Sequence, residues 1–350
     1  MGTTGIQPPA VSVIVPMFNV EAYVGDAIRS LKEQTFGDFE AVLIDDGSTD
    51  DTLKVAREAV DLDGRFKIVS QQNAGPATAR NHGVSASSGT YLMFLDADDT
   101  LAENALLILY NTAISRKLDY LDFSAHTVYA REQLRAVRDE SFYEGRSSID
   151  GVMTGRELFT RFQRNGDYVC ALWLHFFRRT LMEENGLWLR DGMYVHEDEL
   201  FSPLLIAQAK RASFLNEPLY VRRVRDGSAM TSGRGIQNVR SLFEAAQGLK
   251  SWLIAHDDGD DLDFCSAMAQ RIAELYRLAA EDAAQVPASD LVAYSAKLSA
   301  AERVDFEVSV VQGMIEREEF LGSRTYRAGK AVLALPKAAI EAARRLSRSG

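Results

Sequence analysis

Three aspartates, Asp96, Asp98 and Asp99, follow a short apolar run from Tyr91 to Leu95. Alternate residues of an extended segment share a face, so Asp96 and Asp98 can converge on one target. Carboxylates held that close repel each other, and a divalent cation with oxygen ligands is a usual way to stabilise them. The alternative is an acidic turn in which Asp99 or Thr100 caps the following helix. The cluster alone leaves both interpretations open.

Apolar runs alternate with helical patterns through the first hundred residues. The predicted strands are Val11–Val15, Phe39–Ile44, Phe66–Val69 and Tyr91–Leu95. This alternation is typical of parallel βαβ units, and the polar loops after such strands lie at one edge of the sheet. Asn19, Asp46 and the aspartates therefore share an edge where a nucleotide can bind. Neither glycine signature of a dinucleotide site or a P-loop follows the first strand, so a metal ion or arginines must neutralise the phosphates.

The middle of the chain continues the α/β pattern. The predicted elements are a helix over Leu101–Ser115, a strand over Tyr120–Tyr129, a loop over 130–150, a helix over Gly155–Arg164, core or a pocket wall over Cys170–Phe177, a helix over 199–210 and a strand around Ser213–Val221. Glu197-Asp198-Glu199 stands at the start of the last of these helices. Three arginines, Arg222, Arg223 and Arg225, follow the last strand.

Composition limits the classes of partner. The chain has 350 residues, 46% hydrophobic and 25% charged, which is ordinary for a soluble protein. Its net charge of −11 argues against nucleic acid as a partner. No apolar run reaches the ~20 residues that cross a bilayer, and the first ten residues lack a secretory signal. The only two cysteines, Cys170 and Cys265, lack metal-ligand spacing, so we expect a cytoplasmic protein.

The last third of the chain differs in composition. Residues 237–256, 262–284, 288–300 and 305–320 are spaced as helices, so we divide the chain into a catalytic domain, 1–235, and a helical extension, 236–350. Residues 324–350 carry seven basic side chains and one acidic one, a net charge of +6 that leaves −17 for the rest. This tail is either a solvated helix or a basic amphipathic segment on an anionic membrane surface, the inner face of the cell membrane.

Five short motifs occur in one order along residues 11–230, and together they resemble a family 2 glycosyltransferase of GT-A fold. They are Val-Ser-Val-Ile-Val-Pro-Met-Phe-Asn, Ile-Asp-Asp-Gly-Ser-Thr-Asp, Asn-Ala-Gly-Pro-Ala-Thr-Ala-Arg-Asn, Leu-Asp-Ala-Asp-Asp and His-Glu-Asp-Glu. The resemblance implies an α/β nucleotide-binding sheet, a nucleotide-sugar donor, a divalent metal (Mn²⁺ or Mg²⁺), inversion at the anomeric carbon and a saccharide or lipid-linked acceptor of the kind used in polysaccharide biosynthesis. A nucleotidyltransferase-like enzyme and a non-catalytic nucleotide-sugar-binding protein are the alternatives.

The resemblance also implies roles for individual residues. Asp98 would ligate the metal and Asp198 would be the general base. Asp46 would accept a hydrogen bond from the base, taken as uracil, although a turn residue before the next helix would look the same. The other expected nucleotide contacts are Pro16, Phe18, Asn19, Glu21, Arg80 and Asp96.

A last group of polar residues could contact the diphosphate or the acceptor. Its members are His196, Glu197, Arg222, Arg223 and Arg225. Guanidinium groups pair with phosphate in bidentate geometry, whereas a surface salt bridge is the alternative for each arginine. Asp99 is expected to support its neighbours or to cap a helix rather than to bind metal.

Overall fold

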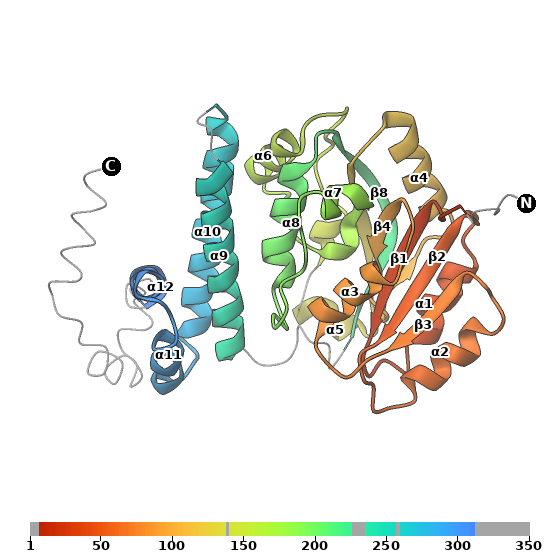
Figure 1. Cartoon of the computed structure of the whole chain (residues 1–350), viewed down its shortest axis with the longest axis horizontal. Helices are drawn as coiled ribbons and strands as arrows, with labels where there is room; N and C mark the ends of the chain where they lie inside the picture. The colour runs from red at the N-terminus through yellow and green to blue at the C-terminus, as the bar shows by residue number, and fades with distance from the viewer. Residues whose placement is uncertain (1–6, 138–139, 226–234, 257–259, 312–350) are drawn as a thin grey trace, which may run out of the picture. The chain divides into compact units, whose positions relative to one another are not determined.

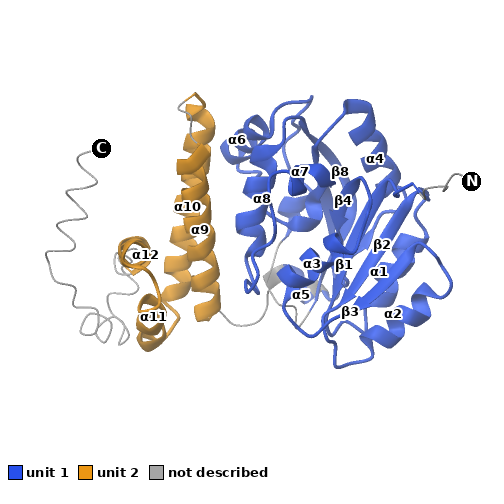
Figure 2. Cartoon of the chain, viewed as in Figure 1, with its two compact units in different colours: residues 1–231 blue, residues 232–350 orange. Residues whose placement is uncertain are grey.

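The computed structural model describes residues 7–137, 140–225, 235–256 and 260–311 (Figure 1). The chain divides into two compact units, Met1–Thr231 and Ser232–Gly350, which we call the sheet unit and the helical unit (Figure 2). None of the described helices is long and apolar enough to cross a membrane. The basic tail, 324–350, lies outside the described residues.

One eight-stranded sheet forms the centre of the described part of the sheet unit, in the order β3-β2-β1-β4-β7-β6-β8-β5. The strands are β1 (Val11–Met17), β2 (Phe39–Asp45), β3 (Phe66–Ser70), β4 (Tyr91–Phe94), β5 (Thr100–Leu101), β6 (Tyr120–Tyr129), β7 (His175–Arg178) and β8 (Ala212–Val224). The first four are mutually parallel, as predicted. Their carboxyl ends therefore meet at one edge.

The apolar runs form strands because both faces of this half of the sheet are covered. Every residue of β1 except Pro16 is buried, and so are all four residues of β4. A strand buried on both faces takes a continuous apolar sequence instead of an alternating one. Burying each large apolar side chain contributes ~1.5–3 kcal/mol, which is why these strands hold the edge in place.

The other half of the sheet is mixed. β7 runs antiparallel to β4 and β6, while β8 runs parallel to β6 and antiparallel to β5. The pairing of β6 with β8 shifts register between Phe123 and Ala125, and such an irregularity re-aims the strand beyond it. The far end of β8 then pairs with Thr100 and Leu101. The helix predicted over Leu101–Ser115 consequently starts only at Ala105.

Helices flank the sheet (Figure 1). They are α1 (Val24–Lys32), α2 (Thr52–Val60), α3 (Pro76–Ser85), α4 (Ala105–Arg116), α5 (Glu132–Val137), α6 (Gly155–Asn165), α7 (Arg179–Glu183) and α8 (Glu197–Gln208). Residues 130–150, predicted as a loop or an excursion, contain α5 and a 3₁₀ turn at Ser141–Tyr143, so the plain loop is wrong. Gly155 opens α6 against α8, where a Cβ would collide with the Ile206 carbonyl. This close approach fixes the helix that carries Asp198.

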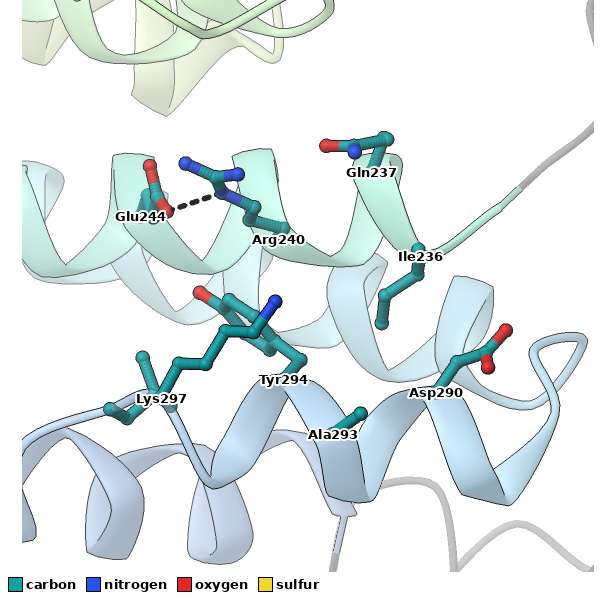
Figure 3. Close-up of a pocket in the computed structure, with 9 residues that line it drawn as sticks. Ile236, Gln237, Arg240, Glu244, Asp290, Ala293, Tyr294 and Lys297 are labelled. Atoms are coloured by element: carbon teal, nitrogen blue, oxygen red, sulfur yellow. Dashed lines mark hydrogen bonds and ion pairs between the residues drawn. The ribbon is translucent and has the colours of Figure 1, made fainter.

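The helical unit contains α9 (Ile236–His256), α10 (Leu262–Ala283), α11 (Ala288–Ser295) and α12 (Ala300–Phe306), which continues into a π-helical turn, Glu307–Val311. The helix predicted over 305–320 is thus described only to Val311. A cavity of about 440 Å³ lies between α9 and α11 (Figure 3). Arg240 and Glu244, on its α9 side, are paired with each other at 2.7 Å, so much of its charge is internally neutralised.

Candidate active site

The loop after β1 is tied to the loop after β2. The Asn19 side chain accepts a hydrogen bond from the Thr49 amide at 2.8 Å, and Glu21 accepts one from the Asp51 amide at 2.8 Å. Asn19 adopts the left-handed conformation (φ 50°) that this turn requires. Phe18 is 47% exposed beside the half-buried Pro16. Asn19 and Glu21 thus shape the rim, while Phe18 leaves an aromatic face open to a planar ligand.

Asp46 organises the turn that leads into α3. Its Oδ1 accepts hydrogen bonds from Gln71 Nε2 at 2.7 Å and the Ala74 amide at 2.9 Å, and its Oδ2 accepts one from the Gly75 amide at 2.9 Å. A carboxylate offers about four acceptor positions. The described residues fill three of them, which leaves one acceptor position on a side chain that is 3% exposed. The turn function and the nucleotide function are compatible.

Tyr194 lies at this same turn, and the sequence analysis does not name it as a site residue. Its ring packs on Gly75, where a Cβ would lie 2.8 Å from Tyr194 Cε1 and where φ is +90°, and the residue is 53% exposed. The segment before it is anchored to α3, because Asn81 exchanges two hydrogen bonds with the Leu189 backbone. No sequence pattern indicates this contact, since only the fold brings residue 194 beside residue 75.

Arg80, on α3, joins the two sides of the site. Its Nη2 donates to Asp96 Oδ1 at 2.7 Å and its Nη1 donates to Glu197 Oε1 at 2.6 Å. The guanidinium is buried, and the two carboxylates raise its pKa against the opposing effect of burial. Arg80 therefore binds the aspartate cluster after β4 to the first residue of α8.

Asp98 pairs with Arg225, which follows β8. Arg225 Nε donates to Asp98 Oδ2 at 2.8 Å, and its guanidinium carbon lies 4.7 Å from the centre of the Tyr23 ring. Arg223 stacks on the same ring at 5.3 Å but pairs with Asp26 at 3.1 Å. Of these two predicted diphosphate contacts, only Arg225 directs its side chain at the aspartate cluster.

Asp99 is buried and does not cap a helix, so that alternative is wrong. It accepts hydrogen bonds from the Tyr220 hydroxyl at 2.8 Å and the Arg223 amide at 2.7 Å, and it pairs with Arg222 at 3.3 Å. Burial raises the pKa of Asp99 to about 7, opposed by the charge of Arg222. Asp99 and Arg222 therefore lock the end of β8 beneath the cluster.

Asp198 lies in the first turn of α8, after His196, which adopts a left-handed conformation (φ 59°). Burial raises the pKa of Asp198 well above its ordinary value, as do the neighbouring carboxylates of Glu197 and Glu199. The Cys170 thiol opposes this shift by donating to Asp198 Oδ2 at 3.4 Å. A carboxyl group with a raised pKa is a stronger base once it is ionised.

A divalent cation fits this edge in one particular way. No group of three or more metal-ligating side chains occurs among the described residues. Magnesium-like cations, however, are commonly held by one or two carboxylates with substrate phosphates and water. Asp98 Oδ1 and Asp96 Oδ2 accept no hydrogen bond within the described part of the chain. The donor set therefore suits a metal that binds together with a diphosphate.

A parallel half-sheet with an acidic edge, continued by a mixed half, defines the GT-A class of fold. The structure of S. aureus TarS 1–349 in complex with UDP-GlcNAc shares this fold, with a TM-score of 0.59 and 21% identity over 87% of this chain and 80% of that one. A family model described as glycosyl transferase family 2 matches residues 12–185. The chain belongs to this family, and both the predicted family and the predicted fold class are confirmed.

Curated relatives carry glycosyltransferase names. EpsJ of Bacillus subtilis, an uncharacterized glycosyltransferase, is 31% identical over 63% of this chain and 62% of its own length. A cholesterol galactosyltransferase of Borreliella burgdorferi is also 31% identical, over 63% of this chain and 62% of its own length. GlyA of Streptococcus pneumoniae is 28% identical over 62% of this chain and 31% of its own length. The chain thus spans about three fifths or less of these relatives.

Proposed function

We propose that this protein is an inverting, metal-dependent glycosyltransferase that moves a sugar from a nucleotide sugar, a UDP-sugar, to a hydroxyl of a saccharide or lipid-linked acceptor. The observation that carries this proposal is the Arg80 bridge. It ties the carboxylate after β4, on the donor side, to the residue beside Asp198. The proposed metal and diphosphate site and the proposed general base are therefore connected by the two ion pairs of the buried Arg80.

The chain's residues divide the work of transfer. Phe18 and Asp46 hold the nucleotide's base. Asp96 and Asp98 face the ribose and the diphosphate, where a bound cation would neutralise the leaving group. The acceptor oxygen attacks the anomeric carbon on the face opposite the diphosphate, and its proton passes to Asp198. The bond from the anomeric carbon to the diphosphate oxygen breaks, so the configuration inverts. A positioned base of this kind contributes ~10²–10⁴ in rate.

The donor class is tested by thermal shift and transfer. We expect UDP with Mn²⁺ to stabilise the protein, whereas GDP and dTDP do not, and Asp98→Ala to remove the metal-dependent part. Asp198→Asn should keep the UDP shift and lose ~10²–10⁴ of transfer. Asp38→Asn is the matched control, because Asp38 is exposed at the opposite end of β2. Full transfer by Asp198→Asn would contradict the assignment of the base.

We also propose that residues 1–235 carry the catalysis and that the extension, 236–350, brings the chain to its acceptor. The seven basic residues of 324–350 supply an anionic-surface contact at about 1 kcal/mol each, which suits a lipid-linked acceptor on the cytoplasmic face of a membrane. The galactosyltransferase relative, whose name gives a sterol acceptor, supports a lipid hydroxyl. Co-sedimentation with anionic and neutral vesicles tests this, and equal binding to both would refute it.

A further inference from the structure

Each aspartate of the cluster has an arginine of its own. The pairs are Asp96 with Arg80, Asp99 with Arg222 and Asp98 with Arg225. The first two arginines are buried and each has a second carboxylate, Glu197 for Arg80 and Glu140 for Arg222. Those two pairs belong to the framework. The third pair is built differently.

Arg225 and Asp98 are each only half engaged. Arg225 uses its Nε for Asp98 Oδ2 and rests on the Tyr23 ring, and its two terminal amino groups make no hydrogen bond with any described residue. Asp98 Oδ1 is likewise without a hydrogen bond from the described part of the chain. The two side chains are 14% and 13% exposed. Because both side chains keep hydrogen-bonding atoms that no described residue uses, each can take a new partner more easily than the buried pairs of Arg80 and Arg222 can.

A guanidinium and a divalent cation compete for the same carboxylate. A cation that binds both oxygens of Asp98 displaces Arg225, which then keeps only its contact with Tyr23. A cation on the free Oδ1 alone is repelled by the guanidinium on Oδ2. A diphosphate changes this balance, because its oxygens accept a guanidinium in bidentate geometry. The arginine then loses one anionic partner and gains another.

We propose that Arg225 is a built-in counter-ion for Asp98 that passes to the donor diphosphate when the metal takes its place. This inference rests on the proposed metal role of Asp98. Its consequence is thermodynamic coupling, since each ligand removes the obstacle to the other. Coupling of this kind is reciprocal, so UDP must strengthen Mn²⁺ binding by the same factor by which Mn²⁺ strengthens UDP binding.

The test measures binding instead of turnover. Free Mn²⁺ is followed by its EPR signal as the full-length protein is titrated, with and without UDP. In the wild type we expect weak Mn²⁺ binding alone and binding ~5–150-fold tighter with UDP. Arg225→Ala should bind Mn²⁺ alone about fivefold more tightly than wild type and should bind UDP with Mn²⁺ less tightly. The factor by which UDP tightens Mn²⁺ binding should therefore be smaller in Arg225→Ala than in the wild type, because Mn²⁺ alone binds more tightly and UDP with Mn²⁺ binds less tightly.

Arg223→Ala is the matched control, because Arg223 stacks on the same ring but pairs with Asp26. Its affinity for Mn²⁺ alone should equal that of the wild type. Equal affinities for Mn²⁺ alone in the wild type and Arg225→Ala would overturn the exchange, while the proposed function would stand. UDP binding that never responds to Mn²⁺ in either protein would refute the metal role of Asp98, and the exchange with it. Failure to bind UDP at all would refute the donor class.

Discussion

Replacing Arg80 with alanine should lower the unfolding free energy of the sheet unit by more than the removal of any exposed ion pair would. The change leaves Glu197, whose side chain is 11% exposed, and Asp96, at 26%, without their shared cation. Breaking a buried pair from one side costs about 3–5 kcal/mol. Asp96 regains some water, so we expect a loss near the lower end, about 3 kcal/mol. Glu197→Gln in the same chain should recover part of it, because an amide needs no counter-ion.

Urea unfolding of the full chain measures this loss. The three tryptophans are Trp173, Trp188 and Trp252, and a Trp252→Phe background confines the fluorescence to the sheet unit. Arg29→Ala is the control, since Arg29 is 65% exposed in its pair with Asp26 and such pairs contribute ~0–1 kcal/mol. If Arg80→Ala lost no more than Arg29→Ala, the bridge would not hold the two sides together.

Three further changes have definite signs. Cys170→Ala removes the thiol that stabilises the Asp198 carboxylate and so raises the pKa of Asp198; the acidic limb of kcat/KM should move to higher pH, and Cys170→Ser should return it. Gly75→Ala places a Cβ 2.8 Å from the Tyr194 ring at φ +90° and should cost about 1–3 kcal/mol in urea unfolding; Tyr194→Ala in the same chain should recover only the steric part. Burial raises the pKa of Asp99 to about 7, so the folded state keeps a proton that the unfolded state releases above about pH 4; unfolding free energy should therefore fall from about pH 4 to about pH 7, and Asp99→Asn should flatten that slope.

The part of the fold that the sequence predicts best is the part governed by local pattern. Fully buried strands such as β1 and β4 are continuous apolar runs, and the polar residues after them must share an edge once the strands are parallel. The helix over Leu101–Ser115 was placed four residues too early for a non-local reason. Thr100 and Leu101 pair with Tyr220 and Val221, more than a hundred residues away, and no periodicity records that pairing.

The site shows the same division. The aspartates and the arginines could be singled out as candidates, but the pairs between them could not, because no spacing in the sequence records that Arg80, Arg222 and Arg225 each reach a different aspartate. Asp99 looked like a helix cap because a helical pattern follows it. Asp99 instead contacts Tyr220 and Arg222, which lie on β8 beyond the shift in its register with β6. Tyr194 had no local signal at all.

The anchoring of residues 189–194 along α3 bears on how chimaeras with relatives can be built. Leu189 is held by Asn81, Asp191 by Thr78 at 2.8 Å, and Tyr194 rests on Gly75. A segment exchanged with a relative would arrive without the helix face that receives it. Chimaeras should therefore transplant residues 75–81 and 189–194 as one module, and natural recombination or drift should be expected to treat them as a single inherited block.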